Sequence, residues 1–587
     1  MPFDAKRVAK ICPILVCISL NACNQRKFNS NQYETNASST LSQESSRAAA
    51  MEAERNALSA QRQKSDALTE LIRNLSQQMQ ELQVIQRSGR GSPLTYSCLN
   101  NGCRNEVVGN LPLFNKKVGI PVGFPFPKIS NKDGEWSSTI NVFPSLWGDA
   151  EGESAVEIPD SNVFVTANAI VPLYLLQISN NSRPFFDSMM RSAISDIRTY
   201  ARGKAFSFWP QHTSTHGSFT VVGPLNIPLK VANLQKLFTW IPQGPNTPPA
   251  KAATIKWLKD ALDPGVNPTL EEGLVNIPND SDDSAVSAAA LLLAYKRGYL
   301  TPAEAQDIYT QAVTALSELD KFKDEGRNKE DGRDSWKPHN SGAYLTWLRS
   351  EDKSAFADPN LGFIPSNVNN VDCVVNANAL FAKGLLATLQ ENSNTEAAVS
   401  ARAAAVAAIT LAVQKQAWPN CGLYYPQQMI FPYTASRAYR EGNIPELKPA
   451  MQLLLKQLIA TQKNYANQNP ALAGAFPGGV DKTFDLSTSL GLVTLLNIGK
   501  PLATELALDA DYDAAVTSAL SFIQGRAAHN AQNLESGVFF SASSWNLAQW
   551  RSKPYTVAIV LEGIAKYLAA YDVGIGNIAT GLHINEP

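Results

Sequence analysis

A degenerate element recurs along most of this chain and constrains its fold more than any other feature. A short polar group, often containing an Asp, opens a helix of Ala, Leu and other small or apolar residues. Six such helices, with more polar amphipathic helices between them, predict a repeat of helical hairpins. The expected helices are Val163–Leu176, Ala285–Tyr295, Val374–Leu386, Leu490–Ile498, and those that begin at Tyr433 and Tyr555.

Small residues on the inner helices leave room at the axis of a closed ring. We therefore expect an all-α fold, an α/α toroid of six hairpins over residues 136–587, with its mouth at the N-termini of the inner helices. An open superhelix has the same periodicity and stays the alternative.

Residues 45–88 predict a helix with coiled-coil spacing that precedes the toroid. A seven-residue apolar repeat favours a homo-oligomer, and the alternative is a lone helix lying on the body. The apolar lines are Met51, Leu58, Ile72 and Met79, and Leu68, Leu75 and Leu82.

The N-terminus has the order of a secretory signal. Lys6, Arg7 and Lys10 precede a short apolar run, which ends in Leu20-Asn21-Ala22-Cys23. This ending resembles the lipobox of bacterial lipoproteins, which implies cleavage of residues 1–22 and attachment of lipid, such as palmitate, to Cys23. Asn24 favours the outer membrane facing the periplasm, and the polar residues 23–44 predict a flexible tether. An ordinary cleaved signal is the alternative.

Charge and cysteine content limit the partners. With 51 Lys+Arg and 52 Asp+Glu, the chain has no basic excess for nucleic acid. In an oxidising compartment, Cys98 and Cys103 predict a local disulfide inside a connector of residues 89–135. Cys373 and Cys421 are expected to be buried thiols, with pairing as the alternative. Of the five His residues, His212 and His216 are four apart, but the Thr, Ser and Gly around them predict a loop, and the other three are isolated. Neither a metal nor another cofactor is therefore expected.

Several segments resemble a known family. Ile277 to Ala285, which contains Asp280, Asp282 and Asp283, resembles the Asp-x-Asp-Asp-Thr segment of class II terpene cyclases. Over residues 150–570 the pattern resembles the terpenoid-cyclase-like α/α toroid, although the Gln/Trp repeats typical of squalene-type cyclases have no clear copy. The other matching segments are Phe208-Trp209-Pro210, Asn370 to Asn378, Tyr424-Tyr425-Pro426 and Ser436-Arg437-Ala438-Tyr439.

The resemblance implies that Asp282 is a general acid, tuned by Asp280 and Asp283, that protonates an alkene. Aromatic rings would then stabilise carbocations through their π faces. The candidate aromatic residues near the mouth are Trp209, Tyr344, Trp347, Tyr425, Phe431, Tyr433, Phe540 and Trp545.

Other functions fit the same residues. Asp before an Ala-rich helix is a preferred N-cap, and we expect Asp372 and Asp485 to be caps, although both are also candidate ligand contacts, with Arg437. Asp282 could instead pair with Asp160, Asp372 or Asp485 in a glycan-cleaving enzyme. A non-catalytic protein that binds a small molecule, glycan or peptide is the third possibility.

Overall fold

The computed structural model describes residues 31–83, 107–113, 116–121, 134–142, 156–175, 183–213, 220–223, 277–327, 331–349, 364, 368–390, 396–478, 483–528, 534–542 and 548–571. Within these ranges, no helix is both long enough and apolar enough to cross a bilayer.

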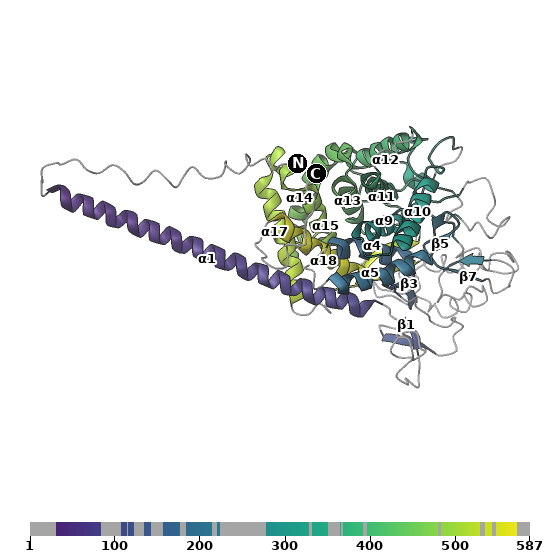
Figure 1. The fold of residues 1–587 in the computed structure, drawn as a ribbon, viewed down its shortest axis with the longest axis horizontal. Helices are drawn as coiled ribbons and strands as arrows, with labels where there is room; N and C mark the ends of the chain where they lie inside the picture. Colours follow the sequence, from purple (N-terminus) through teal and green to yellow (C-terminus); the bar gives the residue numbers. More distant parts are fainter. Residues whose placement is uncertain are drawn as a thin grey trace, which may run out of the picture. The chain divides into compact units, whose positions relative to one another are not determined.

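The inner helices form a closed ring. Each contacts the next in chain order, and α18 contacts α4, so the order α4–α9–α11–α13–α15–α18 returns to its start (Figure 1). This closure confirms the predicted toroid and excludes an open superhelix. The inner helices are α4 (Val163–Leu175), α9 (Ser281–Arg297), α11 (Cys373–Leu389), α13 (Ile430–Arg440), α15 (Phe484–Ile498) and α18 (Lys553–Ala570).

The outer layer alternates with the inner one along the chain. Each of five inner helices contacts a more exposed helix that follows it, which completes a hairpin. The outer helices are α5 (Arg183–Arg198), α10 (Pro302–Leu319), α12 (Glu396–Gln414), α14 (Lys448–Gln468) and α17 (Asp509–Ala528), with the short α16 (Lys500–Glu505) before α17. Single-turn helices lie at η1 (Gly332–Asp334), η5 (Pro445–Leu447) and η6 (Pro470–Leu472).

A small antiparallel sheet, which the sequence did not predict, lies where the ring closes. Its order is β4 (Val156–Asp160), β3 (Ser138–Val142), β10 (Ala548–Ser552) and β9 (Gly537–Ala542). β4 leads into α4 and β10 leads into α18, so the β3–β10 ladder holds the first and last inner helices together.

Two-stranded hairpins account for the other strands. These are β1 (Val107–Leu113) with β2 (Lys116–Pro121), β5 (Ala201–Arg202) with β6 (Ala205–Phe206), and β7 (Gln211–Thr213) with β8 (Thr220–Val222).

One hydrogen bond recurs at five of the inner helices. A residue that precedes the helix donates its backbone N–H to a side-chain oxygen in the first turns of that helix, which fixes how the incoming chain meets the ring. The pairs are Trp136 to Thr166 (3.1 Å), Phe206 to Ser284 (3.0 Å), Tyr344 to Asn376 (2.9 Å), Phe476 to Thr488 (3.2 Å) and Gly537 to Thr556 (3.1 Å).

A glutamine clamp recurs as well. Gln83, directly after α1 (Asn31–Leu82), donates to the carbonyls of Gly134 (2.9 Å) and Met189 (2.9 Å). Gln462 of α14 donates in the same way to Gly474 (2.9 Å) and Ala515 (3.2 Å). Both glycines have positive φ, 90° and 91°, and a Cβ on either would collide with a carbonyl of the following outer helix.

The clamps show that the end of α1 belongs to the ring. Gln83 contacts α5 through Met189 as Gln462 of α14 contacts α17 through Ala515, so residues 65–83 take the outer position of the sixth hairpin. Trp136 follows Gly134 as Phe476 follows Gly474, and the Trp136 indole donates to the carbonyl of Met79 (2.8 Å). The fold thus brings Gln83 together with Gly134 and Trp136, which lie about 50 residues later in the sequence.

This arrangement corrects part of the coiled-coil prediction. Leu68, Ile72, Leu75 and Met79 are buried in the core of a single chain, because this stretch packs on the protein's own body. Oligomerisation through the remaining helix, where Met51 is 50% exposed, stays a prediction.

We predict that a chain starting at residue 91 does not fold cooperatively, whereas one starting at residue 47 does. The shorter chain lacks four fully or almost fully buried apolar side chains and the Gln83 clamp, and each buried aliphatic side chain contributes about 1.5–3 kcal/mol. Urea unfolding followed by tryptophan fluorescence checks this. Equal midpoints for the two chains would contradict the assignment of residues 65–83 to the toroid.

Candidate functional site

The three carboxylates of the acidic motif lie at the start of α9 and have different environments. Asp280 is the N-cap, and its carboxylate accepts the backbone N–H of Asp283 (2.6 Å). Asp282 and Asp283 follow in the first turn, and all three side chains are buried. The capping role predicted for Asp residues therefore belongs to Asp280, which leaves two buried carboxyl groups that the cap does not need.

Asp282 contacts two polar side chains from other elements. Its Oδ1 accepts from the amide of Asn378 in α11 (2.7 Å), and its Oδ2 is hydrogen-bonded to the hydroxyl of Tyr425. Only 5% of Asp282 is exposed. The sequence motif therefore points its middle carboxyl group inward, toward the neighbouring helix and the loop that carries Tyr425.

Burial raises the pKa of all three carboxyl groups. For Asp282 the pKa lies well above its usual value, because burial and then the charge of Asp280 outweigh the Asn378 hydrogen bond and the charge of Arg437. Burial raises the pKa of Asp280 to about 6, and burial together with the Asp280 charge raises the pKa of Asp283 well above its usual value. Burial therefore favours the neutral, protonated form of Asp282.

Arg437 of α13 is fully buried and lies against the rings of Phe381 (4.5 Å) and Tyr433 (4.8 Å). It donates to Asn378 Oδ1 (2.7 Å), Asn168 Oδ1 (3.1 Å) and the Tyr433 hydroxyl (3.0 Å). Residues of α4, α11 and α13 therefore meet at one guanidinium inside the ring.

The polar contacts continue from Tyr433 to α18. The Tyr433 hydroxyl donates to Glu562 Oε2 (2.9 Å), and Lys566 lies 3.7 Å from the other Glu562 oxygen. Lys566 also pairs with Glu441 and donates to Asn497 (2.6 Å). Burial raises the pKa of Glu562 to about 7. Tyr433 is thus part of this network rather than an open aromatic wall.

Cys373 and Cys421 form a disulfide, which corrects the expectation of buried thiols. The pairing was missed because 48 residues separate the two positions, and only the fold brings them together. The bond ties the first residue of α11 to the loop that carries Tyr425. Asp372 adds a second attachment: it caps α11 by accepting from Val374 (2.7 Å) and also accepts from Leu423 in the loop (2.5 Å).

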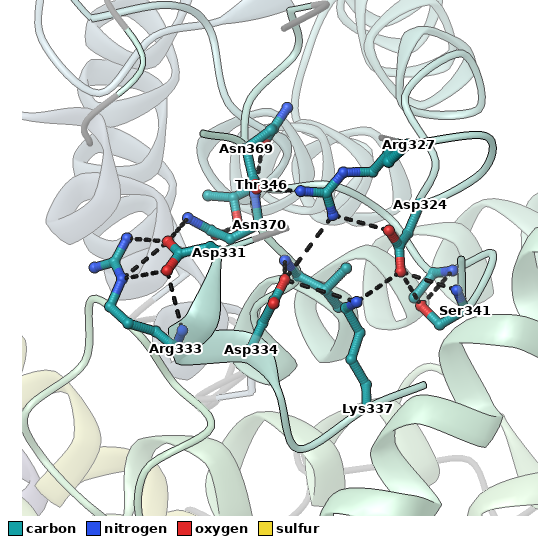
Figure 2. Close-up of polar contacts among 12 residues, drawn as sticks. Asp324, Arg327, Asp331, Arg333, Asp334, Lys337, Ser341, Thr346, Asn369 and Asn370 are labelled. Carbon is teal, nitrogen blue, oxygen red and sulfur yellow. Dashed lines mark hydrogen bonds and ion pairs between the residues drawn. The ribbon is translucent and has the colours of Figure 1, made fainter. Parts of the chain in front are cut away.

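A buried charged cluster lies in the segment between α10 and α11 (Figure 2). Lys337 lies 2.9 Å from Asp324 and 3.8 Å from Asp334, and Arg327 lies 2.8 Å from Asp324. These contacts hold the segment that leads to residues 344–347, where the Thr346 carbonyl accepts from Ser281 at the start of α9 (2.8 Å). The cluster thus acts on the site through the backbone.

Aromatic rings gather around the N-terminal ends of the inner helices, and we call this set the aromatic end. The rings contact one another in series with centroid distances of 4.9–6.1 Å. The set fits a site for an apolar ligand. Its members are Phe164, Phe208, Trp209, Trp347, Tyr424, Tyr425, Phe539, Phe540, Trp550 and Tyr555.

Asp160 holds two of these rings in place. Its oxygens accept from the indole N–H of Trp209 (3.0 Å) and of Trp550 (3.0 Å), and from Asn162 (2.9 Å). Burial raises the pKa of Asp160 to about 7, although these donors lower it. Asp160 is therefore a support of the aromatic end.

Other predicted residues lie elsewhere. The prediction that Asp485 is a cap is wrong: it lies within the first turn of α15, and its carboxylate pairs with Arg526 (2.9 Å). Tyr344 donates to Asp320 (3.2 Å) beside Lys383, and Phe431 is buried in α13. Trp545, His216, Cys98, Cys103 and the lipidation candidate Cys23 lie outside the described residues.

Sequence reasoning missed Asn378, Asn168 and Glu562 as site residues. Each is a polar residue inside an otherwise apolar inner helix, and this was the available signal, because a buried polar side chain needs a partner. In the described part of the chain, no group of three or more His, Cys, Asp and Glu is placed to hold a metal ion.

Comparisons with known proteins give little beyond this geometry. No family model matches the sequence. No curated protein matches it either. Among solved structures, the chain is similar to an arginine-to-alanine variant of the type II terpene cyclase MstE from Scytonema, in complex with its substrate geranylgeranyl dihydroxybenzoate. That similarity has 13% identity and a TM-score of 0.36, and covers 74% of this chain and 92% of that one.

We predict that replacing Cys373 and Cys421 together by Ser lowers the free energy of unfolding by about 2–4 kcal/mol. The change removes a covalent link between α11 and the Tyr425 loop. Guanidinium unfolding of both proteins, with and without reducing agent, measures the effect. Reductant should weaken the wild type more than the double variant, which keeps only the predicted Cys98–Cys103 bond, and the same loss in both proteins would exclude the Cys373–Cys421 bond as its cause.

Proposed function

We propose that this chain is an acid-catalysing enzyme in which Asp282 protonates an apolar, unsaturated ligand at the aromatic end of the ring. The observation that carries the proposal is the burial of Asp282, hydrogen-bonded to Asn378 and Tyr425, which raises its pKa and favours the neutral acid. A neutral carboxyl group in a desolvated place is a strong proton donor, because its proton is not held by water.

The aromatic end supports the second half of the chemistry. A protonated alkene is a carbocation, and the faces of Phe, Tyr and Trp rings stabilise cations without attacking them. Tyr425 belongs to the aromatic end and is also hydrogen-bonded to Asp282, so the aromatic end adjoins the proton donor. The resemblance of the acidic motif to class II terpene cyclases implies the same role for its middle Asp.

The geometry favours this function over glycan cleavage. A glycosidase needs a second carboxyl group across an open cleft. Asp372 is occupied by backbone N–H groups, Asp485 by Arg526 and Asp160 by two indoles. The second candidate is a non-catalytic binding or scaffold protein, which the mutual packing of Phe208, Trp209, Phe540 and Trp550 favours.

The proposed setting is the bacterial cell envelope, with the lipid on Cys23 as the anchor. The disulfide between Cys373 and Cys421 supports export, because disulfides persist in oxidising compartments. Outer-membrane sorting rests on Asn24 after the lipobox.

The Asp282→Asn substitution tests the acid. We predict that it raises the free energy of unfolding at pH 8 by about 1 kcal/mol or more. Replacing a residue that is kept for function at a cost in stability often stabilises the protein. The amide can still accept from Asn378, and its N–H group can donate to the Tyr425 oxygen.

The pH dependence has a definite sign. Because the folded pKa of Asp282 is raised, the unfolded chain ionises first as the pH increases, and the wild type loses stability from about pH 4 upward. The gain in Asp282→Asn should thus be small at pH 4 and grow toward pH 8. Asp485→Asn is the control, since loss of the Arg526 pair should destabilise it. If Asp282→Asn unfolds more easily at every pH, the carboxylate is structural and the scaffold candidate takes its place.

The anchor gives a further prediction. Cys23→Ser should abolish incorporation of labelled palmitate in a bacterial host, whereas Cys17→Ser, which lies in the predicted signal, should retain it. Label that persists in the Cys23 variant would contradict the lipobox.

A further inference from the structure

Arg437 acts on Asp282 through a neighbouring residue. It determines the orientation of Asn378, and Asn378 donates a hydrogen bond to Asp282. Its guanidinium is a donor only, and Nη2 lies 2.7 Å from Asn378 Oδ1. The other amino group, Nη1, likewise only donates, and its acceptors are Asn168 Oδ1 and the Tyr433 oxygen. Asn378 must therefore turn its carbonyl oxygen toward Arg437.

The orientation of Asn378 has a consequence at Asp282. With its carbonyl facing Arg437, Asn378 presents its amide N–H to Asp282 Oδ1 at 2.7 Å. An amide N–H cannot accept a hydrogen bond, so Oδ1 is the oxygen that accepts and cannot carry the acid proton there. The other oxygen, Oδ2, meets the Tyr425 hydroxyl, which can donate or accept.

We infer that Arg437 is a positioning residue: through Asn378 it fixes the acid proton of Asp282 on Oδ2, beside Tyr425 and the aromatic end. That this proton is used in catalysis rests on the proposed function. It concerns only where the proton lies, so it can be tested without a substrate.

The fixed position matters for a proton donor. If Asn378 could rotate by half a turn, its carbonyl would face Asp282 and draw the proton to Oδ1, toward α11. The proton would then point away from the Phe164 and Phe540 rings, which lie 5.9 Å and 6.1 Å from that of Tyr425. Such rotation would turn the Asn378 amide N–H toward the guanidinium, so that this Arg437 donor would lose its acceptor, and an unsatisfied buried group costs about 1–3 kcal/mol.

Infrared spectroscopy of the full-length protein tests the inference. The difference spectrum between wild type and Asp282→Asn at pH 5 isolates the C=O stretch of neutral Asp282. We expect a single band at the low wavenumber of a carbonyl that accepts a hydrogen bond. The same subtraction is then made in the Arg437→Gln, Arg437→Lys and Asn378→Ala backgrounds, with circular dichroism to verify folding.

In Asn378→Ala the band should shift to higher wavenumber, since the carbonyl oxygen loses its donor. In Arg437→Gln, whose side chain both donates and accepts, the single band should become two. Arg437→Lys, which is again a donor only, should restore one band. Lys restores the positive charge together with the donor, so the control for charge is Asn378→Ala, which keeps Arg437 and removes only the amide.

Two results would overturn the inference. If Arg437→Gln lowers stability but leaves the wild-type band unchanged, Arg437 is structural only. If Asn378→Ala does not move the band, the amide does not bind the carbonyl oxygen. The absence of any neutral Asp282 band in the wild type is a different failure, because it would remove the proton donor and with it the proposed function.

Discussion

The structure depends on the closure of the ring, in which α18 contacts α4 and the β3–β10 ladder joins the adjoining strands. It joins residues near the two ends of the toroid, with Trp550 paired to Ile140 in the ladder and its indole bound to Asp160. Only a closed ring turns the polar positions of its inner helices toward one another. Arg437 can therefore contact Asn168 of α4 and Asn378 of α11 at once.

The inside of this ring is unusually polar for a core of small residues. Asp282, Asn378, Arg437, Tyr433 and Glu562 are all buried, and hydrogen bonds connect them in that order. Burying charges is costly unless each is paired, and replacement of such networks by apolar residues is often neutral or stabilising. A stable toroid does not require this network, and its cost is understandable if the network holds an acid in a defined state.

Local patterns predicted much of the fold. Ala-rich helices with polar openings located all the inner helices, because a ring axis admits only small side chains, and Asp372 is the cap that was expected. The acidic motif likewise directed attention to Asp282. What could not be predicted depends on contacts between distant residues: the Cys373–Cys421 bond, the sheet at the ring closure, and the meeting of Gln83 with Gly134. Asp485 misled because an Asp in the first helical turn looks the same in sequence whether it caps the helix or pairs with Arg526.

The central claim is that Asp282 is a neutral acid whose proton lies on Oδ2. Neutron diffraction from deuterium-exchanged crystals at pH 7 would show that proton directly. The account predicts a deuteron on Oδ2 beside Tyr425, with the deuterated amide of Asn378 directed at Oδ1. A bare carboxylate at Asp282, or an Asn378 carbonyl facing it, would contradict the account.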